Sequence, residues 1–227
     1  MIITNCLEGL FAYSLTSTGV ELVPRLAQSH GTWDAGRTQY TVSIRKDVEW
    51  WDGSDLTATD VVWNFQRLTE FAKQNLSSHA EMWQDTNGTP LLTQIEAIGE
   101  HTVKMTLTEP VPHWEKLLAF WGAVLIQPIP NLFGAVPISQ IASINGTGPF
   151  RYSHFDPGID KHVQLLDNLQ YFRGEPDFRT LFFRVFSDQE EMEVALLNKE
   201  IHLTSFSSSD LFSIAESDSR ITTTQVS

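Results

Sequence analysis

The chain has 227 residues, of which 41% are hydrophobic and 19% charged, so it can bury a core and is not a disordered segment. Its formal net charge is −13 and it contains no run of basic residues, which argues against a nucleic-acid or anionic-membrane partner. We interpret the negative charge as a contribution to solubility.

The chain carries one cysteine, Cys6, which excludes an internal disulfide. A bacterial lipid-anchor cysteine follows a charged and then apolar leader, and the residues before Cys6 form neither. We therefore expect Cys6 to be a small buried hydrophobe. The sequence shows no signal peptide and no apolar run of about 18 residues that would span a membrane.

The first part of the chain predicts a strand, a turn and a helix in succession. Apolar and polar residues alternate from Gln39 to Arg45, which is typical of a half-buried strand. Asp52-Gly53 predicts a tight turn, and Thr57 with Asp60 three residues later predicts the start of a helix. One apolar stripe is expected on that helix, made of Val61, Phe65, Leu68 and Ala72.

Residues 74–90 are polar and rich in turn formers, and they predict an exposed loop. A hairpin is expected between Ile95 and Leu107, and the two prolines of 109–112 end it because proline cannot donate to a strand ladder. Residues 113–121 predict a short helix with one buried face, composed of Trp114, Leu117, Leu118 and Trp121.

The second part of the chain begins after a proline-rich, weakly periodic run, residues 127–144, in which we expect a loop with one short helix. Strands are expected over 161–167 and 181–186. Ser187 and Glu190 have the spacing of a capping box, which predicts a helix through Leu197. All seven tryptophans precede residue 122, and this change in composition predicts a boundary near residue 145.

Residue types that carry catalysis are present, but their positions favour structural roles. Acidic side chains lie in turns or at expected helix starts, whereas a glycosidase needs two carboxylates facing one cleft. The histidines lack the spacing of a metal site, and Gly146-Thr147-Gly148 is followed by proline and lacks the third glycine of a phosphate loop. We predict no enzyme, no metal site and no cofactor.

Among the tryptophans, one position favours ligand contact. Trp50 and Trp51 are adjacent at a strand end, so their side chains point to opposite faces and at most one is buried. Trp83 lies in the polar stretch 74–90, where we expect no core for it to enter. We therefore predict that Trp83 faces a ligand.

Several motifs occur in a fixed order along the chain. They are Glu8-Gly9-Leu10, Leu22-Val23-Pro24-Arg25-Leu26-Ala27, Trp50-Trp51-Asp52-Gly53, Leu56-Thr57-Ala58-Thr59-Asp60-Val61-Val62, Glu109-Pro110-Val111-Pro112, Gly146-Thr147-Gly148-Pro149-Phe150 and Asn168 to Pro176. This order resembles family 5 of the extracellular solute-binding proteins, the oligopeptide-, dipeptide- and nickel-binding proteins of ABC importers. Two positions depart from the family pattern, Phe172 where Trp is common and His202 where Asp is usual.

The resemblance implies an α/β, periplasmic-binding-protein-like fold of type II (peptide-binding-protein class), with two lobes that close by hinge motion. Residues 1–145 are expected to form an N-terminal segment plus an inserted Trp-rich α/β subdomain. Residues 146–227 are expected to be part of the lobe I mixed sheet, with the second lobe missing. In the family, the loop after the strand at Lys199–Leu203 faces the cleft, which makes Ser205, Phe206 and Ser207 further ligand-binding candidates.

The resemblance also implies a function, namely non-catalytic capture of a solute, expected to be a peptide, and delivery to ABC permease subunits. We expect a monomer that acts in the periplasm or at the cell surface. It would contact the membrane only through the permease or a lost lipid anchor, and its export signal would be absent from this chain. The alternatives are the ligand-sensing domain of a regulator, a stand-alone interaction module, and a Trp-rich carbohydrate-active enzyme.

Overall fold

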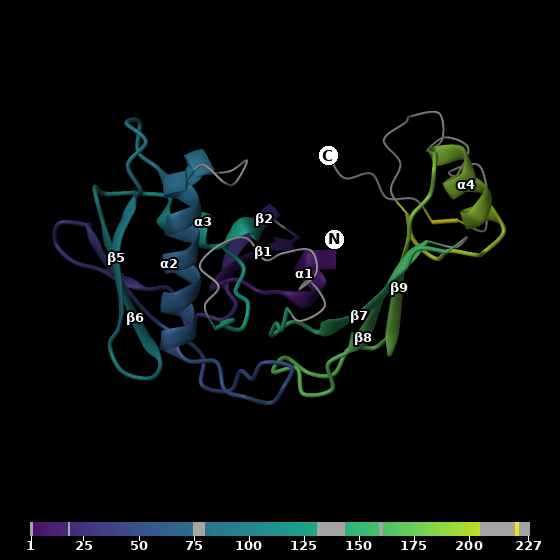
Figure 1. Cartoon of the computed structure of the whole chain (residues 1–227), viewed down its shortest axis with the longest axis horizontal. Coiled ribbons are helices and arrows are strands. Elements are labelled where there is room, and N and C mark those ends of the chain that lie inside the picture. The colour runs from purple at the N-terminus through teal and green to yellow at the C-terminus, as the bar shows by residue number, and fades with distance from the viewer. Residues whose placement is uncertain are drawn as a thin grey trace. The chain divides into compact units, whose positions relative to one another are not determined.

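The computed structural model describes residues 2–17, 19–74, 80–130, 144–158, 161–204 and 221–222 (Figure 1). Its elements, in chain order, are α1 (Ile2–Cys6), β1 (Phe11–Thr16), β2 (Gly19–Pro24), β3 (Thr32–Trp33), β4 (Gln39–Ser43), α2 (Ala58–Gln74), η1 (Ala80–Trp83), β5 (Leu92–Ala97), β6 (Thr102–Leu107), α3 (Trp114–Leu118), η2 (Trp121–Ala123), β7 (Phe150–Asp156), β8 (His162–Asp167), β9 (Thr180–Arg184) and α4 (Gln189–Leu197). The strands form sheets ordered β1-β2, β3-β4-β6-β5 and β7-β8-β9. None of the described helices is long and apolar enough to cross a membrane.

The four-stranded sheet carries the main core, and each of its neighbouring strand pairs is antiparallel. Tyr40 lies opposite Met105, and Val42 lies opposite Val103. All four side chains are buried, which confirms the alternation predicted for the strand at Gln39–Arg45. Helix α2 packs on β5 and β6 of this sheet (Figure 1).

Helix α2 begins where the sequence predicts it. The Asp60 carboxylate accepts hydrogen bonds from the Thr57 backbone N–H, at 2.8 Å, and from the Thr57 hydroxyl, at 3.0 Å. Gly53 in the preceding turn has φ of 83°, a conformation that favours glycine. The expected apolar stripe is confirmed: Val61, Phe65 and Ala72 are buried and Leu68 is partly buried.

Trp83 lies in the core, so the expectation that this residue has no core to enter is wrong, whereas its contact with a ligand stays a prediction. The short helix η1 turns the chain back onto α2, and the Trp83 side chain is 5% exposed. Its ring packs edge-on against Phe65, at a centroid distance of 6.3 Å, and against Trp114, at 5.9 Å. The polar residues around Trp83 gave no indication of a core position. A single turn of helix is nevertheless enough to bury one aromatic side chain among polar neighbours.

The helix expected over residues 113–121 is shorter than predicted. Trp114, Leu117 and Leu118 are buried as expected, but α3 ends at Leu118. Phe120 then adopts an extended conformation, with φ −69° and ψ 141°, which breaks the helical periodicity. Trp121 is consequently 48% exposed and lies against the Phe120 ring rather than in the core.

The second part of the chain differs from expectation at its helix start and at its last strand. Asp188, not Ser187, is the N-cap of α4: its carboxylate accepts from the Glu191 N–H at 2.8 Å, and Glu191 accepts from the Ser187 N–H at 3.0 Å. The strand expected at Lys199–Leu203 is not formed in the described structure. Lys199 has φ of 62°, so it occupies a left-handed position that ends α4 and disfavours an extended start.

The chain divides into two compact units. One comprises Met1–His154 and Gln164–Leu181, and the other Phe155–Val163 and Phe182–Ser227. Residues 146–154 therefore belong to the first unit, whereas the composition change had suggested a boundary near residue 145. Assignment of 1–145 and 146–227 to an inserted subdomain and a lobe stays a prediction.

Two tryptophan substitutions test this core. Trp83, expected to face a ligand, is buried, and Trp121, expected to be buried, is 48% exposed. Trp83→Ala is expected to lower the free energy of unfolding by about 3–5 kcal/mol, because a buried aromatic ring is lost and a cavity remains. The measurement is urea unfolding followed by circular dichroism.

Trp121→Ala is the matched control, and we expect a change within about 1 kcal/mol because that ring is already half exposed. Equal losses of stability in the two variants would contradict the assignment of Trp83 to the core.

Candidate functional site

The residues predicted to face a ligand are not brought together in the described structure. Trp83 is a core residue, as shown above. Ser205, Phe206 and Ser207 lie outside the described residues, and the last residue described before them is Thr204. The polar and glycine-rich motifs, in contrast, do meet in space.

A cluster of two buried and two partly buried side chains joins four of the sequence motifs, and we call it the motif junction: Glu8, Arg25, Thr147 and Tyr171. The Glu8 carboxylate accepts hydrogen bonds from the Tyr171 hydroxyl, at 2.7 Å, and from the Thr147 hydroxyl, at 3.1 Å. Arg25 Nε lies 3.7 Å from Glu8 Oε1. The junction therefore ties residues near both ends of the first unit to a single carboxylate.

The charge of Glu8 is only partly compensated inside this junction. Burial raises the pKa of the Glu8 carboxyl, and the hydrogen bond from Tyr171, the charge of Arg25 and the hydrogen bond from Thr147 act in the opposite direction. Burial likewise raises the pKa of the Tyr171 hydroxyl, with the Glu8 charge adding to the effect. Tyr171 therefore stays protonated here: its hydroxyl donates to Glu8, and its oxygen accepts a hydrogen bond from Arg25 at 3.5 Å.

The glycines of Gly146-Thr147-Gly148 allow the chain to cross closely over the end of α1. Gly148 donates its N–H to the Cys6 carbonyl at 3.1 Å. A Cβ at Gly148 would lie 2.7 Å from the backbone oxygens of Asn5 and Cys6. The motif is therefore a close backbone contact, which agrees with the prediction that it is no phosphate loop. Cys6 beside it is buried as expected, and burial raises the pKa of its thiol to about 12.

Trp51 also forms hydrogen bonds with this glycine segment. Its backbone N–H bonds the Gly146 carbonyl and the Asn145 side chain, at 3.1 and 3.0 Å, and its indole N–H donates to the Gly148 carbonyl at 3.1 Å. Trp50 is 2% exposed and Trp51 is only partly buried, which confirms that at most one of the pair is buried. The tryptophan pair thus joins the core to the glycine motif.

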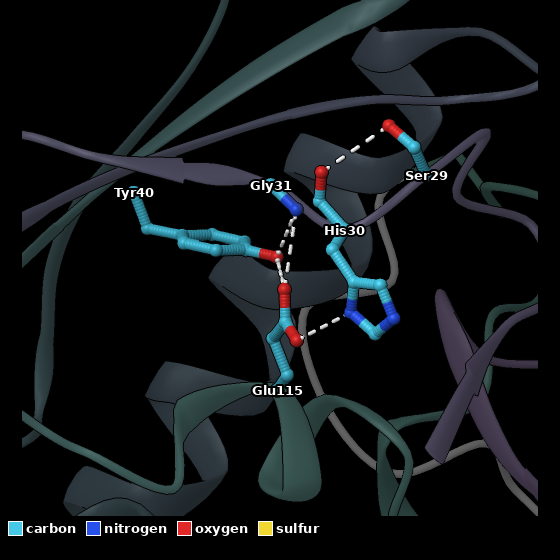
Figure 2. A network of polar contacts seen from close by, with 5 residues as sticks. All are labelled: Ser29, His30, Gly31, Tyr40 and Glu115. Atoms are coloured by element: carbon cyan, nitrogen blue, oxygen red, sulfur yellow. Dashed lines mark hydrogen bonds and ion pairs between the residues drawn. The ribbon is translucent and has the colours of Figure 1, made fainter. Parts of the chain in front are cut away.

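A second polar network resembles an acid–base site in its residue types (Figure 2). Tyr40 donates its hydroxyl to Glu115, and the Gly31 N–H lies 2.9 Å from the Tyr40 oxygen and 3.1 Å from Glu115 Oε1. His30 Nδ1 lies 2.7 Å from Glu115 Oε2. Burial and the Glu115 carboxylate raise the pKa of Tyr40, so this network anchors residues 30–31 to α3 and offers no basic tyrosine.

The described surface of the first unit includes the following two hollows. One of about 440 Å³ is lined by Gln28, Ser43, Lys46, Ile98, Glu100, His101 and Thr102. The other, of about 40 Å³, lies between α2 and residues 122–125 and includes Arg67. No group of three or more His, Cys, Asp or Glu side chains suited to a metal ion occurs among the residues that the structure describes. Arg67 is not among the predicted site residues, although its position beside Leu68 of the apolar stripe can be read from the sequence.

Gly148→Ala is expected to destabilise the protein by about 1–3 kcal/mol, because the added methyl group meets two backbone oxygens that cannot move independently. Chemical denaturation measures the change. Gly36→Ala is the matched control, since its Cβ would approach side-chain oxygens only, those of Asp34 at 3.3 Å and Thr38 at 3.6 Å. If both variants unfold at the same denaturant concentration as the parent, the close-contact role of Gly148 is refuted.

The raised pKa of Glu8 predicts a specific pH dependence. A carboxyl group with a folded-state pKa above its unfolded value stabilises the fold fully below the unfolded pKa, and that contribution is lost as pH rises through the folded-state pKa. The stability of Glu8→Gln relative to the parent should therefore increase as pH rises above about 4.5.

Thermal unfolding of both proteins between about pH 4 and pH 7 gives this difference. Glu21→Gln, at an exposed glutamate, is the control for the loss of one carboxylate from the chain. A Glu8→Gln difference that is flat, or that falls with pH, would contradict a net burial cost at Glu8.

Comparisons with known proteins agree on one family. Residues 21–226 match the bacterial extracellular solute-binding proteins, family 5. The chain is 35% identical over 104 residues to the periplasmic oligopeptide-binding protein OppA of Escherichia coli, covering 42% of this chain and 19% of that protein. It is 28% identical over 192 residues to the oligopeptide-binding protein AppA of Bacillus subtilis, covering 80% of this chain and 33% of that protein.

Solved structures share the fold. NikA of Brucella suis, in complex with Fe(III)-EDTA, superposes with a TM-score of 0.75 at 20% identity, over 95% of this chain and 41% of that one. A putative peptide-binding protein AppA of Clostridium difficile gives 0.73 at 23% identity, over 95% and 42%. The chain therefore has the fold of these binding proteins and spans less than half the length of each.

The expected resemblance is thus confirmed, and so is the prediction of a non-catalytic protein, since the proteins of this family bind solutes without catalysis. Of the four junction residues and Trp51, the matched region contains Arg25, Trp51, Thr147 and Tyr171, whereas Glu8 precedes it. The chain belongs to family 5 of the bacterial extracellular solute-binding proteins.

Proposed function

We propose that this chain is the solute-capturing part of an extracytoplasmic binding protein that delivers peptides to an ABC permease. The observation that carries the proposal is the family match across residues 21–226, together with curated relatives named for oligopeptides. A Helicobacter pylori protein with a TM-score of 0.73 was solved with the peptide STSA, which supports a peptide as the solute.

The described structure is compatible with a binding role that involves no chemistry. The carboxylates of Glu8 and Glu115 are both occupied by hydrogen bonds from neighbouring groups of the same chain. They therefore fix the framework instead of presenting reactive groups. We propose that Ser205, Phe206 and Ser207 contact the solute, because an aromatic ring flanked by hydroxyl groups suits an extended peptide backbone.

A second candidate solute is a small metal complex. NikZ of Campylobacter jejuni, solved with Ni(L-His), has a TM-score of 0.73 to this chain at 22% identity. A metal that arrives already chelated needs few ligands from the protein. Peptides remain the first proposal because curated relatives named for peptides are 27–35% identical to this chain, above the 22% of NikZ.

Native mass spectrometry of the protein, purified gently in its longest natural form, distinguishes these solutes. We expect a set of adducts at peptide masses, which denaturation releases and fragmentation sequences. Phe206→Ala should lower the occupied fraction, whereas Phe178→Ala, at a ring that is 65% exposed, should leave it unchanged.

A single adduct of metal-chelate or sugar mass would replace the peptide proposal and keep the binding role. A protein that carries no solute and forms a complex with DNA would support the sensing domain of a regulator. A protein that carries no solute and binds another protein would support an interaction module.

A further inference from the structure

Arg67 is a partly buried cation in the middle of α2. Its guanidinium carbon lies 5.5 Å from the centroid of the Trp63 ring and 5.2 Å from that of Phe71, one helical turn to either side. Its Nε is buried without a hydrogen-bond partner, and burial lowers the pKa of the guanidinium. Among the residues that the structure describes, no carboxylate forms an ion pair with Arg67.

The nearest helical carboxylate is engaged elsewhere. Glu70 stands three residues after Arg67, on a suitable face for pairing. It instead lies 3.6 Å from Lys73 Nζ and accepts a hydrogen bond from the Gln74 amide at 2.6 Å. The undescribed stretches 75–79 and 131–143, which adjoin α2 and the 122–130 segment in sequence, contain no Asp or Glu. These stretches therefore cannot supply the missing carboxylate.

The segment that lines the space beside Arg67, opposite α2, is held in place by hydrogen bonds. We call this space the Arg67 hollow, and its lining includes Arg67, Leu68, Phe71, Gly122 and Val124. Asn64, 4% exposed, pins the opposite segment to α2, because its side chain donates to the Ile126 carbonyl at 2.8 Å and accepts from the Ile126 N–H at 3.1 Å. The hollow is therefore shaped before any ligand enters.

The volume and chemistry of the hollow limit what can occupy it. Its volume of about 40 Å³ corresponds to about three water-sized positions, which is the size of a carboxylate group. Aromatic faces compensate a guanidinium only in part, whereas a carboxylate matches its planar fork with two hydrogen bonds. A neutral amide of the same shape would leave the charge uncompensated.

We propose that the Arg67 hollow binds the carboxylate of a small solute, held by the guanidinium between Trp63 and Phe71. The site belongs to α2 and the 122–125 segment and does not depend on the solute proposed above. Acetate is the smallest probe of this chemistry, and acetamide is its neutral isostere.

The test follows the side-chain Nε–Hε resonance of Arg67 by NMR, assigned by its disappearance in Arg67→Lys. We expect acetate to shift this resonance to saturation with a dissociation constant of about 1–10 mM, and acetamide to leave it in place. Sodium chloride at equal ionic strength separates specific binding from screening.

Thermal shift with the same solutes provides an independent readout. Acetate should raise the unfolding temperature of the parent protein, and Arg67→Lys and Arg67→Gln should each weaken that response at least about tenfold in acetate concentration. Arg151→Gln, at an exposed arginine of β7, is the matched control and should respond like the parent.

A resonance that shifts equally with acetate and acetamide, or that does not saturate at about ten times the expected constant, would overturn the proposal. An acetate response that persists in Arg67→Gln would overturn it as well. These outcomes leave the family assignment and the peptide proposal untouched, because neither depends on Arg67.

Discussion

The close passage of residues 146–148 over the end of α1 is the constraint on which the rest of the first unit depends. It requires glycine at 148 because backbone oxygens of Asn5 and Cys6 occupy the space of a side chain. It places Thr147 beside Glu8 and brings the Gly148 carbonyl within reach of Trp51. Family motifs that are scattered along the sequence are thus parts of one packed contact.

Two kinds of buried charge occur in this unit, and they differ in how they are compensated. Glu8 is surrounded by two hydroxyl donors and a guanidinium, so its carboxylate is largely satisfied at the cost of burial. Arg67 has two aromatic rings and an unpartnered Nε. The partners of Glu8 all come from the chain itself, whereas for Arg67 we propose a carboxylate ligand as the partner.

Local sequence predicted the elements well where capping and periodicity agree, as at Thr57–Asp60 and in the strand around Tyr40. It failed where tertiary contacts decide. A single turn buries Trp83 in spite of its polar surroundings, and one extended residue, Phe120, exposes Trp121 in spite of its helical spacing. The sequence revealed the motifs that form the junction but not their contacts. No local pattern indicates which distant hydroxyl group donates a hydrogen bond to Glu8.

The sequence separations within the motif junction bear on how the protein folds. Tyr171 and Thr147 follow Glu8 by 163 and 139 residues. Contacts of such long range form slowly, because most of the intervening chain must be ordered first. At usual rates of synthesis, Tyr171 is added about eight seconds or more after Glu8. Glu8 has no contact with Tyr171 during that time, so completion of the junction is a late event in folding.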